Sequence, residues 1–458
     1  MNDPNGMVVI DGVYHLFFQY NPFGADWGYM SWGHAVSEDM VTWRELDVAI
    51  PWLETDEAFS GSAVDDVDNT SGLGIDGIAP VVAVYTSVLP DRIQAQSLAV
   101  STDRGATWSR HGDGPVLGRG TRDFRDPKLF RHVGADGVAR WIMVAVEAKD
   151  GEILVHSSPN LHDWTYESTI APAGAEGLIW ECPDLFPLPV DGDADRVAWV
   201  LVVSTITPGE GVEKDTAMNY VVGQFDGHTF TSDASARWRR LDYGRDAYAG
   251  VTFSGVPGER RIMIAWMSNW QYAREVPTAP FRGAMSLPRE LSLHSRDGAV
   301  ELRQRVPEEV EATWPAAELA VDEELAPGEE RSHELGTHAV LDLVWTPGEA
   351  DAFEVTLGSL ADDRAALTYD VRRGNLAFRR APHRAMPEGF AGETSMDVPA
   401  ADGRLRLRIV VDAHLVEIFA DDGAAVMSHQ LFGVDDGWVA RLRGHGGVSS
   451  VTVTARRG

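Results

Sequence analysis

Strand-like runs recur in pairs at nearly constant spacing through residues 1–302 of the chain. Each pair joins two runs rich in β-branched and aromatic residues, and clusters of Gly, Asp, Asn and Pro separate the pairs. The starts of the five pairs are 66, 60, 57 and 63 residues apart, at His15, Val81, Trp141, Ala198 and Arg261. A repeat of about 60 residues with several strands per unit is typical of a β-propeller. The spacing therefore predicts an all-β, five-bladed β-propeller rather than an irregular sandwich.

Four of the pairs lead into a polar turn that ends on an aromatic residue. These turns are SEDMVTW to Trp43, STDRGATW to Trp108, SPNLHDW to Trp164 and FDGHTF to Phe230. The second resembles the Asp-box turn of sialidases, which are also propellers. Sialidase chemistry on an anionic sugar calls for a cluster of arginines and a tyrosine nucleophile. We therefore interpret this single clear copy as a structural turn.

The composition changes past Arg303. Residues 303–330 are acidic and rich in Pro and Ala, which is typical of a linker with a short helix. Residues 331–458 return to alternating strand-like runs and predict a β-sandwich. The expected domains are therefore a catalytic propeller (1–302), a linker (303–330) and a sandwich (331–458).

The charge balance of the chain limits its partners. There are 70 Asp and Glu residues against 39 Lys and Arg residues, so the net charge is −31 at pH 7. An acidic chain is repelled by phosphate backbones and anionic membranes, whereas a neutral substrate is compatible with it. No apolar run approaches the ~18 residues of a membrane span. We therefore expect no nucleic acid and no membrane as partners.

Metal and disulfide chemistry find no support in the sequence. Cys182 is the only cysteine, which excludes an internal disulfide framework and a multi-cysteine metal site. The 14 histidines show no HExxH motif and no paired ligand spacing. We predict that the protein uses no metal and no cofactor.

The N-terminus opens directly on MNDPNG, without the basic and apolar regions of a signal peptide. A chain that is complete at Met1 is expected in the cytoplasm. A chain that has lost an upstream segment would be compatible with an extracellular location, so the compartment is left open.

Three carboxylates occupy related places in the repeat. The stretches MNDPNGM, FRDPKLF and WECPDLF share a proline that lies 11, 14 and 15 residues before the first strong run of its unit. Each stretch is predicted to form the first strand of its blade, which lines the central channel of a propeller. Asp3, Asp126 and Glu181 are therefore expected to meet in one pocket. Glu181 lies one residue earlier in this register, and a bulge in its strand would bring it to the same face.

Converging carboxylates with few cations suit glycoside hydrolysis. One carboxylate must be ionised to attack or stabilise the sugar, and the other must keep a proton for the leaving oxygen. The apolar sequence neighbours of Glu181 should raise its pKa and favour the acid role. Flanking asparagines give Asp3 polar surroundings that can keep it charged. Arg125 can hold Asp126 ionised or bind a sugar hydroxyl.

Seven short motifs carry a family resemblance. They are NDPNG (2–6), Gln19 followed by YNP, Trp27, WGH (32–34), FSGS (59–62), RDP (125–127) and EC (181–182). Together they resemble glycoside hydrolase family 32, which contains the invertases, inulinases, levanases and related β-fructofuranosidases. The likeness runs the length of the chain and implies a five-bladed propeller followed by a sandwich. The tryptophan that the family carries just before MNDPNG is absent from this sequence.

The resemblance also implies roles for individual residues. Asp3 would be the nucleophile, Glu181 the acid/base and Asp126 the transition-state stabiliser. The residues that would line the fructosyl pocket are Asn2, Gln19, Trp27, Phe59, Ser60, Arg125 and Trp270.

We therefore predict a retaining glycosidase that releases terminal β-D-fructofuranosyl units from levan or inulin, and from sucrose. Retention requires the carboxyl groups of Asp3 and Glu181 to be roughly 5–5.5 Å apart. The run WMSNWQYAREVPTAPFRGAMSLPREL resembles exo-inulinases and levanases more than plant invertases, so fructan is the preferred substrate. Exo or endo action and β-2,1 or β-2,6 linkage are not decided by the sequence.

Two other interpretations stay open. One is a related five-bladed hydrolase that acts on another furanoside or pentoside with the same three carboxylates. The other is a non-catalytic fructan-binding protein, against which the intact acid trio counts. The sandwich is interpreted as a packing partner or as the contact of a homodimer.

Overall fold

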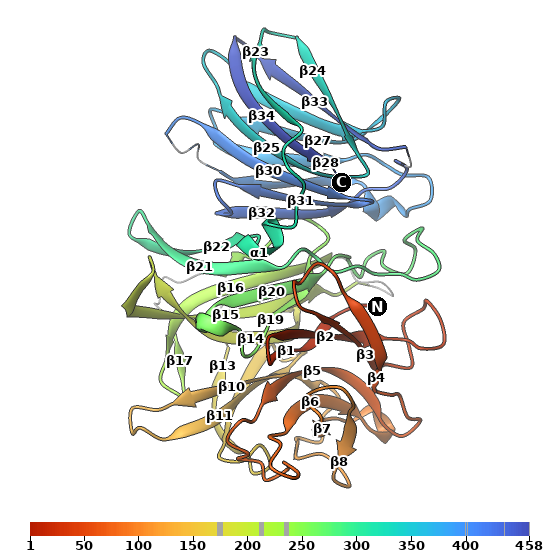
Figure 1. Cartoon of the computed structure of the whole chain (residues 1–458), viewed down its shortest axis with the longest axis vertical. Coiled ribbons are helices and arrows are strands. Elements are labelled where there is room, and N and C mark those ends of the chain that lie inside the picture. Colours follow the sequence, from red (N-terminus) through yellow and green to blue (C-terminus); the bar gives the residue numbers. More distant parts are fainter. Residues whose placement is uncertain are drawn as a thin grey trace. The chain divides into compact units, whose positions relative to one another are not determined.

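The structure is a computed structural model that describes the chain apart from residues 172–176, 210–214, 233–237, 399, 401, 435 and 458. The chain forms two compact units that consist mainly of strands (Figure 1). The first unit comprises Met1–Arg240, Tyr248–Trp266 and Pro280–Val300. The second comprises Leu241–Ala247, Met267–Ala279 and Glu301–Gly458. None of the helices in the described ranges is long and apolar enough to cross a membrane.

The described strands up to Arg305 form five antiparallel sheets, coloured from red to green in Figure 1. The first sheet contains β1 (Pro4–Ile10), β2 (Val13–Tyr20), β3 (Ser31–Ser37) and β4 (Arg44–Ile50). The second contains β5 (Glu57–Asp65), β6 (Val81–Val88), β7 (Gln94–Ser101), β8 (Ser109–His111) and β9 (Leu117–Gly118). The third contains β10 (Phe124–Val133), β11 (Ala139–Glu147), β12 (Glu152–Ser158) and β13 (Thr165–Ile170).

The fourth and fifth sheets are joined by one parallel bridge, between Val190 and Leu293. The fourth contains β14 (Ile179–Val190), β15 (Asp193–Thr207), β16 (Asp215–Phe225), β17 (Phe230–Thr231) and β18 (Arg239–Arg240). The fifth contains β19 (Tyr248–Thr252), β20 (Arg261–Trp266), β21 (Arg289–Arg296) and β22 (Ala299–Arg305). Two single 3₁₀ turns, η1 (Pro90–Arg92) and η2 (Pro257–Glu259), lie in the loops.

The first strands of the sheets form a closed ring. They are neighbours in the order β1, β5, β10, β14, β19 and back to β1. Two backbone hydrogen bonds close the ring: Val9 N–H donates to the Ser254 carbonyl and Ser254 N–H donates to the Met7 carbonyl, both at 2.9 Å. Closure pairs edge groups that an open sheet would leave exposed. The predicted five-bladed propeller is confirmed.

The middle strands of the blades are continuous apolar or β-branched runs because both of their faces are covered. In β6 every residue of VVAVYTSV is buried. Side chains of β6 pack with residues of the first blade on one face and with residues of the third blade on the other. Such double burial favours β-branched residues, which suit a pleated and covered strand.

The polar turns between the third and fourth strands of the first three blades share one geometry. The indole N–H groups of Trp43, Trp108 and Trp164 donate to the carbonyl three residues earlier, at 3.0–3.1 Å. Asp39 and Asp103 accept backbone N–H bonds within their turns, as an Asn does in the third. The Asp-box sequence is therefore one of three equivalent turns, of which the sequence alone showed a single clear copy.

A buried histidine pair in the first blade makes the stability of this unit depend on pH. His15 Nδ1 lies 3.0 Å from His34 Nε2, and His34 stacks on Phe17. Burial lowers the pKa of His15 to about 4 and the pKa of His34 to about 3. Between pH 6.5 and 5 only the unfolded chain takes up protons at these two positions. The free energy of unfolding should therefore fall with acidification below pH 6.5, with a slope that approaches about 1.4 kcal/mol per pH unit for each histidine as the unfolded side chain becomes fully protonated.

Chemical denaturation at pH 7 and pH 5 measures this loss. In a His15→Gln/His34→Gln variant the pH dependence should be flatter than in the wild type, whatever the absolute stability of the variant. An unchanged pH dependence would show that the pair does not titrate as described.

The second unit contains two six-stranded sheets that pack as a β-sandwich. The order in one sheet is β23 (Leu319–Leu325), β34 (Ser449–Arg457), β25 (His338–Thr346), β30 (Leu405–Asp412), β31 (Leu415–Ala420) and β32 (Ala425–Gln430). The order in the other is β24 (Glu330–Gly336), β33 (Trp438–His445), β26 (Ala352–Gly358), β27 (Asp363–Asp370), β28 (Asn375–Arg380) and β29 (Gly392–Asp397). The short helices are α1 (Glu308–Glu311) and η3 (Glu388–Phe390).

Alternate side chains of both sheets meet in one apolar core around Trp345, Phe353 and Trp438. The predicted sandwich is confirmed. The segment 303–330 that was expected as a linker contains α1 and β23, and β23 pairs along its whole length with β34.

A buried ion pair holds two earlier segments of the chain in the second unit. Arg380 donates to Asp246 Oδ2 at 2.7 Å and to Tyr272 Oη at 2.8 Å, and Tyr272 donates to Asp246 Oδ1 at 2.6 Å. All three side chains are at most 2% exposed. A charge can be buried at tolerable cost when a partner satisfies its hydrogen bonds. Asp246 and Tyr272 thus pack with the sandwich although they lie in the span expected for the propeller.

Candidate active site

Each innermost strand of the propeller carries a β-bulge at a corresponding position along the strand. The last regularly paired residues before the register shifts are Asn5, Phe59, Arg125, Glu181 and Tyr248. These five side chains therefore occupy equivalent positions in the five blades. A bulge leaves its extra residue outside the ladder and redirects the neighbouring side chains.

Several bulges need a left-handed backbone. The φ angles of Gly6, Asp126, Cys182 and Ala249 are 52°, 59°, 48° and 53°. At Gly6 a Cβ atom would lie 2.5 Å from the ring of Trp32, so only glycine fits there. Asp126 and Cys182 adopt the same conformation without being glycine, which is uncommon and costs free energy.

The bulges correct the register that was inferred from the prolines. Pro4 is paired before its bulge, whereas Pro127 and Pro183 lie inside theirs. Asp126 is therefore equivalent to Cys182, and Glu181 is equivalent to Arg125. The three carboxylates approach one another through shared contacts with Cys182 and Arg125, but the shared proline does not mark one structural position.

Asp3 is buried and hydrogen bonded at the start of β1. Asn2 Nδ2 donates to Asp3 Oδ1 at 3.0 Å, and Ser60 Oγ donates to Asp3 Oδ2 at 2.9 Å. Burial raises the pKa of Asp3, and the neighbouring negative charge of Glu181 raises it further. The polar surroundings that were expected to keep Asp3 charged are present, but they do not outweigh burial.

Asp126 is held from two sides within its bulge. Its backbone N–H donates to Thr86 Oγ1 at 2.9 Å, and its Oδ2 accepts the backbone N–H of Cys182 at 3.0 Å. Burial raises the pKa of Asp126 to about 7, although the guanidinium of Arg125 acts in the opposite direction. The side chain of Arg125 lies 3.8 Å from Asp126 Oδ2.

Glu181 faces a cation and a phenol. Arg125 Nη2 donates to Glu181 Oε1 at 2.9 Å, and Tyr248 Oη donates to Glu181 Oε2 at 2.5 Å. Equivalent positions of blades three, four and five therefore meet in one hydrogen-bonded group. The expected apolar surroundings of Glu181 are wrong, because its sequence neighbour Trp180 turns into the apolar core of the unit.

Two residues that contact the carboxylates, Tyr248 and Cys182, were not predicted as site residues from the sequence. Burial raises the pKa of Tyr248 well above its usual value, so its hydroxyl stays protonated and can donate to Glu181. The signal for Tyr248 was its phase in the fifth repeat unit. Cys182 Sγ lies 3.8 Å from Oδ2 of both Asp3 and Asp126, and burial raises the pKa of this thiol.

The predicted sugar-binding residues divide into two groups. Gln19 pairs through its backbone with Asn2 and Asp3, and its Nε2 donates to the Ala58 carbonyl at 3.1 Å. Trp27 contacts Phe59 edge-on, with ring centroids 5.9 Å apart. The structure thus links Asn2, Gln19, Trp27, Phe59, Ser60 and Arg125 to the strand ends that carry the carboxylates. Trp270 lies in a segment of the second unit, and its role stays a prediction.

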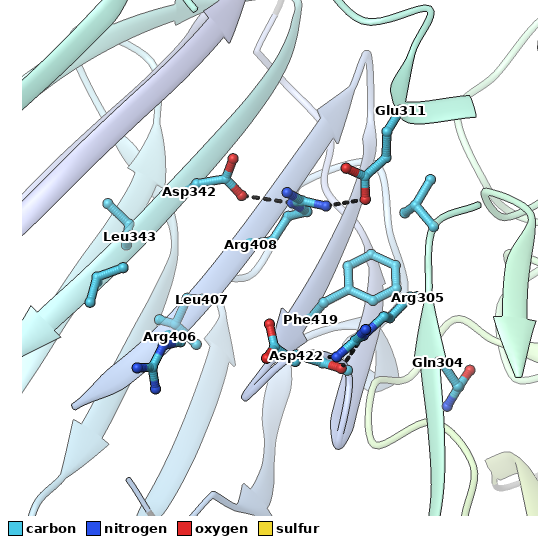
Figure 2. A pocket seen from close by; sticks show the side chains of 13 residues that line it. Gln304, Arg305, Glu311, Asp342, Leu343, Arg406, Leu407, Arg408, Phe419 and Asp422 are labelled. Atoms are coloured by element: carbon cyan, nitrogen blue, oxygen red, sulfur yellow. Dashed lines mark hydrogen bonds and ion pairs between the residues drawn. The ribbon is translucent and has the colours of Figure 1, made fainter. Parts of the chain in front are cut away.

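A cavity of about 340 Å³ lies in the second unit. Figure 2 shows Arg408 between Asp342 and Glu311, and Arg305 beside Asp422. Each of these carboxylates has an arginine partner, so the cavity does not present the acid pair that glycoside hydrolysis needs. Within the described residues, no group of three His, Cys, Asp or Glu side chains is placed to hold a metal ion.

Comparison with known proteins assigns the whole chain to one family. The model of the glycosyl hydrolases family 32 N-terminal domain matches residues 1–305, and the model of the family 32 C-terminal domain matches residues 301–455. The levanase of Bacillus subtilis is 39% identical over an alignment of 447 positions, gaps included, that covers 93% of this chain and 64% of the levanase. The extracellular exo-inulinase of Aspergillus niger is 34% identical over an alignment of 499 positions, gaps included, that covers 98% of this chain and 90% of the inulinase.

Solved structures agree with this assignment. The crystal structure of the exo-inulinase from Aspergillus awamori matches with a TM-score of 0.93 and 33% identity, over 100% of this chain and 95% of that chain. The β-fructofuranosidase from Schwanniomyces occidentalis, complexed with fructosyl-erythritol, matches with a TM-score of 0.88 and 28% identity over the same shares. The chain, which spans about two thirds of the Bacillus subtilis levanase, belongs to glycosyl hydrolases family 32.

Proposed function

We propose that this chain is a retaining β-fructofuranosidase that releases terminal fructosyl units from fructans and from sucrose. The observation that supports this most directly is the meeting of Asp3, Asp126 and Glu181 from three blades, with Glu181 bonded to Arg125 and Tyr248. The names of the relatives, levanase and exo-inulinase, support fructose polymers as the substrate class.

In the first step, Asp3 attacks the anomeric carbon C2 of the terminal fructosyl unit. An ester bond forms between Asp3 and C2, the bond from C2 to the leaving oxygen breaks, and Glu181 gives its proton to that oxygen. The hydrogen bonds from Asn2 and Ser60 fix the direction of the Asp3 carboxylate before the attack.

In the second step, a water molecule attacks C2 and Glu181 accepts its proton. The ester bond breaks, fructose leaves with its original anomeric configuration, and Asp3 is free again. While Asp3 is esterified it carries no charge, so it no longer repels a negative charge on Glu181. This favours the ionised Glu181 that the second step requires.

We assign to Asp126 the role of binding the hydroxyl groups of the fructosyl ring. Hydrogen bonds from a carboxylate to these hydroxyls strengthen as positive charge develops on the ring in the transition state. The Cys182 N–H and the Thr86 hydroxyl hold Asp126 in its bulge, so the carboxylate is oriented in advance. We assign to Trp27 and Phe59 the role of contacting the apolar face of the sugar.

Product analysis tests the proposal. The purified chain is incubated with sucrose, inulin and levan, and early products are followed by NMR. Fructose as the sole product from the polymers, released first as the β-anomer, is the expected result. Oligosaccharides among the early products would show that the chain cleaves internal bonds, which is endo action, and would contradict the proposed exo action. Fructan binding without turnover would favour the non-catalytic alternative, and activity confined to other furanosides or pentosides would favour the related hydrolase.

We also propose that any homodimer forms through the sandwich. Sedimentation of the purified chain distinguishes a monomer from a dimer. A dimer that persists after charge-reversing substitutions on the exposed sandwich surface would reject this contact.

A further inference from the structure

Three aromatic side chains form an exposed cluster on the first blade. Phe23 and Tyr29 come from the loop between β2 and β3, and Trp52 follows β4. The ring centroids are 5.2 Å apart for Phe23 and Tyr29, 5.1 Å for Tyr29 and Trp52, and 6.2 Å for Phe23 and Trp52. Phe23 is 69% exposed and Tyr29 is 51% exposed. We call Phe23, Tyr29 and Trp52 the aromatic triad.

Hydrogen bonds and an ion pair tie the loop that carries Phe23 and Tyr29 to neighbouring residues. Ser31 Oγ donates to the backbone carbonyl of Tyr29 at 3.1 Å and accepts a hydrogen bond from the backbone N–H of Trp52 at 2.8 Å. One hydroxyl therefore joins the backbones of two members of the triad. Asp26, in the middle of the loop, pairs with Arg282 at 2.7 Å. Tyr29 has a φ of 52°, which a bulky residue rarely adopts. These contacts position the backbone that presents the aromatic triad.

The loop between β2 and β3 links the triad to the candidate active site. The same loop carries Trp27, which contacts Phe59. Phe59 occupies the position in its blade that Glu181 occupies in the fourth blade, and its neighbour Ser60 donates to Asp3. One loop thus carries both Trp27, which is assigned to the reacting fructosyl unit, and the two exposed rings of Phe23 and Tyr29.

We propose that the aromatic triad binds fructosyl units of the polymer on the leaving-group side of the bond that is cleaved. This inference rests on the proposed function. An exo-acting site holds only the terminal unit, so the rest of the polymer must run outward over the surface. Aromatic rings offer apolar faces to the C–H faces of sugars, and exposed apolar patches mark binding surfaces. Such contacts are equal in ground state and transition state, so they lower KM for polymers without changing kcat.

Steady-state kinetics on sucrose and on long-chain levan and inulin tests the triad. The variant is Phe23→Ala with Tyr29→Asn, because both side chains are exposed and asparagine tolerates a positive φ. KM for the preferred polymer should rise roughly 5- to 20-fold. The kcat on that polymer and both constants on sucrose should stay within about twofold of wild type. The matched control is Tyr166→Ala, a 54% exposed tyrosine on β13, which should leave all constants unchanged.

A binding measurement keeps the inference separate from the proposed function. In a Glu181→Gln background, calorimetric affinity for the polymer should fall by the same factor when the two triad substitutions are added. This loss would support the triad even if the wild-type chain cleaved no fructoside. An unchanged polymer KM overturns the inference, as does an equal loss on sucrose and polymer. A change from dimer to monomer with unchanged polymer KM would assign the patch to a second copy of the chain instead.

Discussion

Replacing Asp3 by asparagine is expected to lower kcat on sucrose and fructan by about 10⁴-fold or more, because the amide cannot form the ester intermediate. The fold should tolerate the change. The side chain keeps its size, and burial together with Glu181 already raises the pKa of Asp3, so the native state does not depend on its charge. Thermal melts should therefore place the variant within a few degrees of the wild type.

A matched control separates this effect from the loss of any buried carboxylate. Asp66 is fully buried in the second blade and accepts bonds from Thr70 and Ser71. Burial opposes its ionisation, but these hydrogen bonds outweigh burial and lower the pKa of Asp66. Asp66→Asn should therefore lower the melting temperature while the folded enzyme keeps its kcat. Ordinary turnover in Asp3→Asn would remove this residue from the mechanism.

Replacing Glu181 by glutamine is expected to lower kcat/KM on sucrose and fructan by about 10²- to 10⁴-fold, because the leaving oxygen receives no proton. The loss should be much smaller on a fructoside with an aryl leaving group, which departs without protonation. Azide should then accelerate turnover, because this anion attacks the ester intermediate without a general base. Asp3→Asn should show neither effect, since it forms no ester.

The control for this substitution is Glu417→Gln, which changes a buried glutamate on β31 in the second unit. Its kinetic constants should match those of the wild type on every substrate. Equal losses of Glu181→Gln on aryl and natural fructosides would contradict the acid role. In that case Glu181 would serve mainly to orient Arg125, its partner at 2.9 Å.

The number of blades and the sandwich could be predicted because the signals for both are local. Alternation of apolar residues, β-branched runs such as that of β6, and polar turns that end on Trp43, Trp108 and Trp164 are all contained in short windows. The pairing of β23 with β34 joins residues more than 120 positions apart. No short window contains that contact, so this strand was expected to be part of a linker.

The candidate site shows the same division. Asp3, Asp126 and Glu181 were predicted together because each lies near the start of an innermost strand. The surroundings of Glu181 were not predicted correctly, because the strand turns Trp180 to one face and Glu181 to the other. Tyr248, its closest hydrogen-bond partner, comes from a different blade.

The amino-acid order by itself indicated most of the strands, although not β23, together with the number of blades and the three acids predicted to meet at the ring. Tertiary structure alone decided what each acid touches. Backbone pairing within the third, fourth and fifth blades places bulges after Arg125, Glu181 and Tyr248, and burial acts on the acids that meet there. The pKa of a carboxyl group depends on every charge and dipole within a few ångströms. Most of these neighbouring groups belong to strands that are far away in the sequence.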